Sequence, residues 1–331
     1  MGFKDIYGHE KQTRILQRAM SRNRIPHAYL FYGMQGIGKR NTALVFAKAL
    51  NCQAGQPDAC CRCLSCLKAD HRNHPDLKII EPAGQSIRIQ EIRELQEQMT
   101  FRPFDGGWRI FIIVDADKMN SVAANALLKT LEEPTPFNIL ILISSRPYQL
   151  PLTILSRCQP LRFNPLSREI VDRYLQEHLS VSADTARLLA ASSGGSIGRA
   201  IAMNDEGYLS LRDKMIESMM GAQRQDPLRF FSIISAFGQE RKDVLERLDI
   251  LKVCFRDALV FKETGMTHCL FNQDRVSEIQ SFTGGYSAAD LLKNIRTVDR
   301  AYRAIDQNAN KSLTLEAMMF KLASKSEYPG E

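Results

Sequence analysis

The stretch that decides the fold is Gly33-Met34-Gln35-Gly36-Ile37-Gly38-Lys39-Arg40. It follows the pattern G-x-x-x-x-G-K, in which backbone N–H groups bind phosphate oxygens and the lysine reaches the outer phosphates of a nucleotide. An apolar run, Tyr29–Tyr32, precedes the loop, and a helical pattern, Asn41–Leu50, follows it. A strand, a glycine-rich turn and a helix in that order are typical of a phosphate-binding loop. The candidate nucleotide-binding residues of this loop are Gly33, Gly36, Gly38, Lys39 and Arg40.

The residue after the lysine departs from the pattern. That position needs Ser or Thr, because its hydroxyl holds Mg²⁺ during nucleotide hydrolysis. Arg40 stands there instead, and its positive charge opposes a metal ion. Thr42 lies two residues further along the predicted helix, and we expect its hydroxyl to point elsewhere. The loop can therefore hold ATP or ADP without requiring either, and we do not expect magnesium-assisted hydrolysis.

A second acidic motif is incomplete as well. The buried strand Arg109–Val114 is followed by Asp115, and an acidic residue at such a strand end can orient magnesium beside a phosphate-binding loop. Asp115 therefore joins the candidate nucleotide-binding residues, although a turn residue at a strand end explains it too. In ATPases of this type the next residue is usually a glutamate that polarises the attacking water. Here it is Ala116, and Asp117 is two positions on and shorter.

Strands that are apolar on both faces alternate with helical stretches between Met1 and Phe163. This alternation predicts an α/β domain with a parallel sheet that helices cover on both sides. The predicted strands are Tyr29–Tyr32, Leu77–Glu81, Arg109–Val114 and Ile139–Ser144, and the predicted helices are Asn41–Leu50, Ile87–Met99 and Ser121–Leu131.

The composition changes after Phe163. Ser167 is a plausible N-cap for a helix that runs through Leu179, and two further helical stretches follow, at Ala183–Ala191 and near Ile197. From about Leu209 the chain shows only amphipathic helices, with breaks near Gln225–Pro227, Thr264-Gly265 and Gly284-Gly285. The sequence predicts three domains: a P-loop domain at 1–164, a three-helix lid at 165–207 and an all-α domain at 208–331.

Four cysteines, Cys52, Cys60, Cys63 and Cys66, lie in a spacing that indicates a metal site. Two overlapping C-x-x-C steps bring three sulfurs around one point, and Cys52 completes a tetrahedron. The module at 52–66 therefore predicts a closed, structural zinc site. An iron–sulfur cluster is a lesser alternative. Cys61 is expected to point away, and His71 and His74 are weaker candidates for ligands.

Composition places few limits on function. The 331 residues carry 44% hydrophobic and 24% charged residues, as in ordinary globular proteins. No apolar run approaches a membrane helix and the N-terminus has no apolar signal region, so we expect a cytoplasmic protein without membrane contact. A net charge of +7 permits contact with nucleic acid or an acidic partner, but a basic solvated surface explains it equally well.

The motifs fall in the order found in the bacterial DNA polymerase III clamp loader, and the chain is similar to that AAA+ family throughout its length. Besides the P-loop and the cysteines, the segments that carry the resemblance are Phe3–His9 (FKDIYGH), Pro26–Phe31 (PHAYLF), Ala124–Pro134 (ANALLKTLEEP), Leu155–Cys158 (LSRC), and Asn308, Asn310, Leu313, Leu315 and Glu316 near the end.

The resemblance implies an α/β AAA+ P-loop domain with its zinc module, a small lid and a helical collar that oligomerises. Members form a hetero-pentamer that opens the ring-shaped sliding clamp and places it on primer-template DNA. The implied partners are therefore gamma/tau ATPase subunits and delta subunits, with the clamp and DNA reached through the complex. In the family, the arginine of Ser-Arg-Cys reaches the ATP of the neighbouring subunit. Arg157 is thus implied as an arginine finger in trans, with a surface ion pair as the plain alternative.

A third departure from the ATPase members lies in the lid. Those members carry an arginine directly after Gly-Ser-x, whereas here Gly198 follows and Arg199 comes one position late, about 100° around a helix. Together with Arg40 and Ala116, this favours a subunit whose own ATPase is absent or weak. An active gamma/tau-like ATPase and a zinc-stabilised DNA-binding protein are the alternatives. Ser or Thr at position 40 would favour the first, and tight, salt-dependent DNA binding by the lone chain the second.

Overall fold

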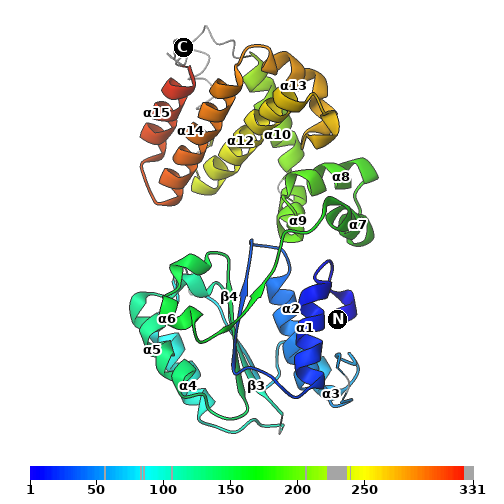
Figure 1. Cartoon of the computed structure of the whole chain (residues 1–331), viewed down its shortest axis with the longest axis vertical. Coiled ribbons are helices and arrows are strands. Elements are labelled where there is room, and N and C mark those ends of the chain that lie inside the picture. The colour runs from blue at the N-terminus through cyan, green and yellow to red at the C-terminus, as the bar shows by residue number, and fades with distance from the viewer. Residues whose placement is uncertain are drawn as a thin grey trace. The chain divides into compact units, whose positions relative to one another are not determined.

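The computed structural model describes residues 1–331 except 56, 83, 85, 106, 206, 222–236, 239 and 324–331. Contacts within the chain define two compact units (Figure 1). The first unit comprises Met1–Ser180 and Gly194–Arg199, and the second comprises Val181–Ser193 and Ala200–Glu331. The division into three domains at 164 and 207 stays a prediction. In the described part of the chain, no helix combines the length and the apolar character needed to cross a bilayer.

The first unit is built on a parallel sheet. Among the described residues, five strands form it in the order β2-β3-β4-β1-β5, and every neighbouring pair is parallel. The strands are β1 (Ala28–Tyr32), β2 (Leu77–Ile80), β3 (Arg109–Ile113), β4 (Asn138–Ser144) and β5 (Gln159–Arg162). The first four confirm the predicted strands to within a residue at each end. The last was not predicted, because its sequence QPLR has one buried position and a proline, which only an edge strand tolerates.

Alternation along the strands supplies two hydrophobic cores, one on each face of the sheet. Phe31 and Ile112 belong to the core that also contains Phe46 of α2 (Lys39–Leu50) and Cys66 of α3 (Leu64–Asp70). Their sequence neighbours on the opposite face pack with residues of α4, α5 and α6. Figure 1 shows α1, α2 and α3 on one side of the sheet and α4, α5 and α6 on the other. The predicted three-layer arrangement is confirmed.

Polar side chains cap the start of two helices in the first unit. Asn120 accepts a hydrogen bond from the Ala123 N–H at the start of α5, and Ser167 accepts one from the Ile170 N–H at the start of α7. The helices are α1 (Glu10–Ser21), α2 (Lys39–Leu50), α3 (Leu64–Asp70), α4 (Ile89–Met99), α5 (Ser121–Glu132), α6 (Leu152–Leu155) and α7 (Arg168–His178), and α9 (Ile197–Asp205) begins in this unit.

The second unit is entirely helical in its described residues. Its helices are α8 (Ala183–Ser192), α10 (Tyr208–Gly221), α12 (Arg241–Thr264), α13 (Val276–Thr283), α14 (Ala288–Asp306) and α15 (Lys311–Ala323), with the end of α9. The long α12 packs against α10, α13 and α14, and α15 packs against α14. The breaks predicted at Thr264-Gly265 and Gly284-Gly285 are confirmed, whereas the one near Gln225–Pro227 lies outside the described residues.

Candidate nucleotide-binding edge and cysteine cluster

The P-loop occupies the carboxyl edge of the sheet, between β1 and α2. Gly33, Gly36 and Gly38 all have positive φ angles, of 148°, 74° and 104°. Glycine is needed at two of them for space as well, because a Cβ on Gly33 would lie 2.2 Å from the Phe163 carbonyl oxygen and one on Gly36 would lie 2.4 Å from Ser196 Oγ. The sequence therefore folds the predicted loop in the predicted place.

Lys39 folds back onto its own loop. Its Nζ donates hydrogen bonds to the carbonyl oxygens of Gly33 (2.6 Å) and Met34 (2.7 Å), and to Ser145 Oγ at 3.3 Å. The side chain is buried, and this burial lowers the pKa of Lys39 to about 8, against the opposing effect of the Asp115 and Asp117 carboxylates. In this arrangement the loop carbonyls accept the hydrogen bonds that the Lys39 ammonium group would otherwise donate to a phosphate.

The Arg40 side chain has an acidic partner within the chain. Its guanidinium pairs with the carboxylate of Glu81, the residue that follows β2. Because β2 pairs with β3 in the sheet, Glu81 lies at the same edge as the loop after β3. The residue that replaces the magnesium-binding hydroxyl thus forms a cross-link between α2 and the end of β2. Thr42, as expected, turns away and donates to the Gly38 carbonyl of its own helix.

The acidic residues after β3 also have internal partners. Asp115, in the left-handed region with φ 50°, accepts a hydrogen bond from Lys118 Nζ at 2.9 Å. Asp117 accepts from Ser144 Oγ at 2.6 Å and from the Ser145 N–H at 3.2 Å, which ties the end of β3 to the end of β4. Each carboxylate that a metal ion could use here is engaged by a residue of the chain.

The segment that contains Gly198 closes over the P-loop. The Gly198 N–H donates to the Gly36 carbonyl at 2.8 Å, and Ser196 Oγ donates to the Gln35 carbonyl at 2.8 Å. From the residue before α1, His9 Nε2 donates to the Ile37 carbonyl at 2.5 Å, and burial lowers the pKa of that imidazole. Three consecutive carbonyl groups of the loop are therefore held by residues distant in sequence.

Arg157 lies at the opposite edge of the sheet. It lies two residues before β5, whose Gln159 pairs with Tyr29 near the start of β1. The P-loop begins four residues after Tyr29, which corresponds to about 13 Å along the strand. Arg157 contacts Glu132 at the end of α5, with Nη2 and Oε1 2.8 Å apart, and donates to the Thr153 carbonyl at 2.9 Å. About a third of its side chain is exposed.

The four cysteines converge. The Sγ atoms of Cys52, Cys60, Cys63 and Cys66 all lie within 4.8 Å of one another, and the Cys60 and Cys66 sulfurs are 4.0 Å apart. Two of the sulfurs accept hydrogen bonds from backbone N–H groups three residues on, in the pattern of the C-x-x-C steps. Backbone N–H donors of Arg62 and Cys63 lower the pKa of the Cys60 thiol to about 6, whereas burial raises that of Cys66.

The weaker ligand candidates have other environments. Cys61 has φ 58° and does not belong to the group of four; its thiol faces the Ala59 carbonyl and the N-terminal amine. His74 is buried with Nε2 3.0 Å from Ser65 Oγ, while its Nδ1 accepts from the Asp76 N–H. His71 is not part of the cluster either. The sulfur set alone fits a metal ion.

Comparison with known proteins identifies the family. A family model described as "DNA polymerase III, delta subunit" matches residues 8–167, and one described as "DNA polymerase III, delta subunit, C terminal" matches residues 206–324. The chain is 32% identical over 315 residues to the DNA polymerase III subunit delta' of Bacillus subtilis, with 93% of this chain and 94% of that protein covered. The chain belongs to the DNA polymerase III delta-prime family. This confirms the clamp-loader family predicted from the motifs, and within it the delta-prime type that Arg40 and Ala116 favour.

Other members of the clamp-loader family are also similar. The chain is 27% identical over 351 residues to the DNA polymerase III subunit tau of B. subtilis, covering 98% of this chain but 62% of that protein. A solved structure of a DNA polymerase III gamma subunit-related protein from Thermotoga maritima aligns over 94% of this chain and 98% of that one, with 19% identity and a TM-score of 0.44.

Sequence reasoning missed several partners at these sites. Glu81 had no signal, because a glutamate after a strand is ordinary until the sheet order brings it to Arg40. Gly198 has a weak signal in the sequence, because it stands one residue before Arg199, but its close contact with Gly36 depends on the path of the chain between α8 and α9. His9 belongs to the motif Phe3–His9, but that motif does not indicate its contact with the Ile37 carbonyl.

Proposed function

We propose that this chain is a clamp-loader subunit that does not itself hydrolyse ATP, or does so very weakly. It assembles with gamma/tau-type ATPase and delta-type subunits in a hetero-pentamer that loads the sliding clamp on primed DNA. The observation that carries the proposal is the pairing of Arg40 with Glu81 at the edge where a magnesium ion would have to sit. A cation at that position meets a guanidinium in place of a hydroxyl, and its acidic ligands already have partners.

The other contacts at this edge point in the same direction. Lys39 is bound to two loop carbonyls, and Asp115 is bound to Lys118. A nucleotide that entered would have to break these hydrogen bonds, each worth about 1 kcal/mol net and more where charge is involved. ADP or ATP can therefore reside here at most as a structural ligand, held by the glycine-rich loop without turnover.

The position of Arg157 supports a role in trans. Its place before β5 puts it at the edge of the sheet away from the chain's own P-loop, beyond the reach of an arginine side chain. It is partly exposed and held by an ion pair with Glu132, which is itself half exposed. Such exposed pairs are worth about 0.2–1 kcal/mol, so the guanidinium can leave Glu132 for a phosphate of a neighbouring subunit at small cost. There it would offset the charge that develops during phosphoryl transfer.

The four-cysteine group supports a structural zinc ion. Zinc–sulfur bonds of about 2.3 Å in a tetrahedron place the sulfurs slightly under 4 Å apart, which is compatible with four sulfurs that all lie within 4.8 Å of one another. An iron–sulfur cluster would hold several iron atoms between the sulfurs and therefore needs a wider group. Four thiolates leave no open coordination position, so the ion would brace the module between α2 and α3 and take no part in chemistry.

Two measurements test the proposal. ATP turnover by the isolated chain is expected to be well below about 1 s⁻¹, the lower end of ordinary enzymes, and turnover at or above that rate would refute the first half. In the assembled complex, Arg157→Ala is expected to slow ATP hydrolysis while gel filtration shows unchanged assembly. Arg157→Lys should be slow too, because an ammonium lacks the planar fork. Arg162→Ala, an exposed arginine on β5, serves as the control, and equal rates for all three would remove the finger assignment.

A further inference from the structure

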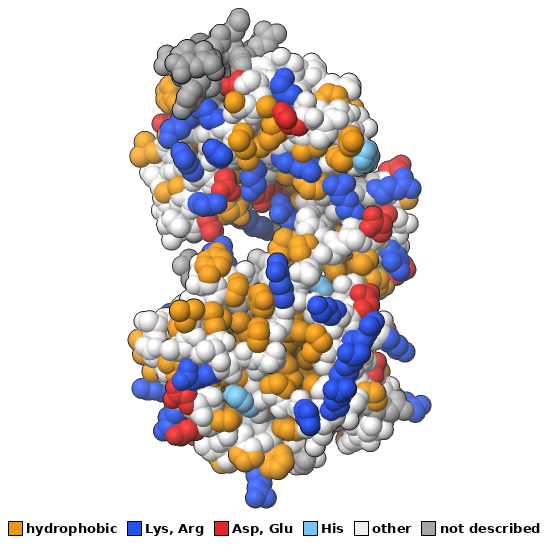
Figure 2. All heavy atoms as spheres, in the orientation of Figure 1, with side chains coloured by type: hydrophobic (Ala, Val, Ile, Leu, Met, Phe, Trp, Pro, Cys, Tyr) orange, Lys and Arg blue, Asp and Glu red, His pale blue; other side chains and the backbone are white. Residues whose placement is uncertain are grey.

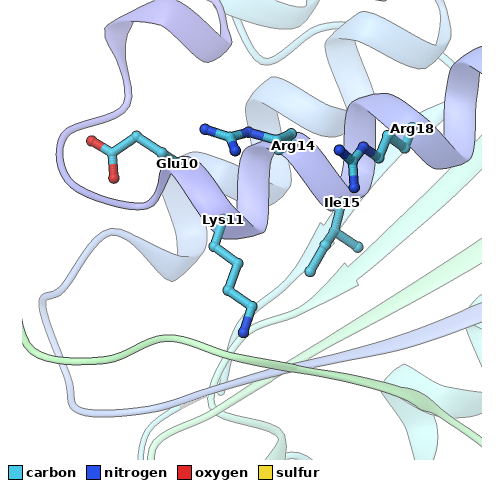
Figure 3. Close-up of a pocket in the computed structure, with 5 residues that line it drawn as sticks. All are labelled: Glu10, Lys11, Arg14, Ile15 and Arg18. Carbon is cyan, nitrogen blue, oxygen red and sulfur yellow. The ribbon is translucent and has the colours of Figure 1, made fainter.

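The outer face of α1 carries a row of basic side chains. Lys11, Arg14 and Arg18 are exposed and lie three and four residues apart, the spacing that places side chains on one side of a helix. Arg22, exposed just after the helix ends, continues the row at the same spacing. The opposite face of α1 is buried through Gln12, Thr13 and Leu16. In Figure 3 the side chains of Lys11, Arg14, Ile15 and Arg18 project from α1, next to a hollow of about 500 Å³.

This row lacks the acidic partners that several arginines elsewhere in the chain have. Within the described residues, Lys11, Arg14, Arg18 and Arg22 form no ion pair, whereas Arg40 has Glu81. Glu10, at the N-terminal end of the helix, lines the same hollow as Lys11, Arg14 and Arg18. Figure 2 shows a row of Lys and Arg side chains on the face of the first unit where α1 lies. Like charges four residues apart on a helix repel, so the row costs stability unless an anionic partner offsets it.

We propose that this face of α1 binds the phosphate backbone of duplex DNA, without reading its sequence. The row spans residues 11 to 22, about 16 Å along a helix axis. Duplex DNA presents one phosphate per about 3.4 Å of each strand, so the row faces several phosphates of one strand. Long, exposed and unpaired side chains can adjust to those positions, which is what a contact to the backbone alone requires.

The composition of the same face argues against other anionic surfaces. Single-stranded nucleic acid is usually held by aromatic side chains that stack on unpaired bases, and α1 (EKQTRILQRAMS) has no aromatic residue. A membrane-surface helix needs a wide apolar face toward the lipid, but the exposed face offers only Ile15 and the apolar face is buried in the core. An acidic protein remains as a distinct outcome of the experiment.

The contact goes beyond the proposed function, which assigns DNA to the complex and no surface of this chain to it. The two can fail separately. Assembly with ATPase and delta-type subunits is measured by gel filtration without DNA. Binding by the α1 face is measured with the full chain alone, at low salt, where weak electrostatic contacts are strongest.

The experiment compares two matched triple variants of the full chain. The test variant is Lys11→Gln, Arg14→Gln and Arg18→Gln. The control removes the same charge from exposed residues elsewhere in the first unit, through the substitutions Arg72→Gln, Lys78→Gln and Arg93→Gln. Binding of a fluorescent blunt duplex is followed by anisotropy between about 50 and 200 mM salt, the range over which phosphate contacts weaken steeply.

The expected result is a change in the slope of log K against log salt. Each lost phosphate contact reduces that slope by about 0.9, so the test variant should lose about 2.7 while the control keeps the wild-type slope. Equal slopes for the two variants would overturn the proposal. Poly-glutamate that binds as tightly as the duplex and depends equally on the α1 residues would also overturn it, in favour of an acidic protein partner. Stronger binding to single strands than to the duplex would contradict the choice of duplex DNA.

Discussion

Replacing Gly198 by alanine tests whether the segment Gly194–Arg199 is held tightly against the P-loop. The Gly198 N–H donates to the Gly36 carbonyl at 2.8 Å, and an added Cβ would lie 2.9 Å from Gly36 Cα and 3.2 Å from its oxygen. Both neighbouring atoms belong to the backbone, so neither can swing aside as a flexible side chain would. The position lies in the first turn of α9, where alanine is otherwise favoured over glycine.

Two opposing effects give the magnitude. The helix preference for alanine would stabilise the fold by about 0.5–1 kcal/mol if the methyl group had room. Overpacking a tight contact costs about 1–3 kcal/mol, and weakening the hydrogen bond adds up to about 1 kcal/mol. The cost of the tight contact should exceed the gain from helix preference, so we expect the free energy of unfolding to fall by about 1–2 kcal/mol. With a urea m-value of about 2 kcal/mol per molar, the midpoint would move down by about 0.5–1 M.

The fluorescence of Trp108 reports the unfolding of the first unit, because Trp108 is the only tryptophan of the chain and lies in that unit. Gly284→Ala is the control: its nearest contact is 3.5 Å, its φ is −58°, and it lies in the second unit, so the Trp108 midpoint should not move. The sign decides the matter. A midpoint that rises in Gly198→Ala would mean that the methyl group has room, and the tight contact between Gly198 and Gly36 would be refuted.

Two further predictions concern the buried lysine and the cysteines. Burial lowers the pKa of Lys39 from 10.5 to about 8 in the folded chain, so the unfolded chain binds more protons between these two pH values. The free energy of unfolding should therefore rise with pH across this window, by up to about 3 kcal/mol. Lys39→Met should abolish the rise, and an unchanged pH profile of urea unfolding in this variant would contradict the burial argument. Cys63→Ser should abolish the binding of stoichiometric zinc, measured after gel filtration, whereas Cys61→Ser should retain it because Cys61 lies outside the group of four sulfurs. A wild-type chain without bound metal would refute the zinc site.

The parts of the fold that follow from local pattern were predictable. The run Ile139–Ile143 is apolar at every position, as expected for a strand that is buried on both faces. The P-loop glycines were predictable for a related reason, because the turn demands positive φ angles. The cysteine cluster was predictable from spacing, since C-x-x-C steps bring sulfurs together almost independently of what surrounds them.

What could not be predicted depends on sheet order and on long-range contacts. The edge strand β5 reads as a polar turn until it pairs with β1, because only Leu161 of its four residues is buried. Helix α3 begins at Leu64, inside the cysteine module, where metal-ligand spacing hides helical periodicity. The partners Glu81 and Gly198 are set by which segments become neighbours in space, and a single sequence contains no signal for that.

The charged side chains at the two edges of the sheet have different kinds of partner, and this difference bears on the kind of subunit that the chain forms. At the carboxyl edge, Lys39, Arg40 and Asp115 all bind residues of the same unit, and the loop carbonyls are tied down as well. An ATPase needs the reverse, since its loop must exchange partners with each nucleotide. At the amino edge, Arg157 has a single exposed ion pair that costs little to break. A carboxyl edge whose charged groups bind one another, and an arginine at the amino edge that can change its partner, suit a subunit that holds its own shape and acts on the nucleotide of a neighbour.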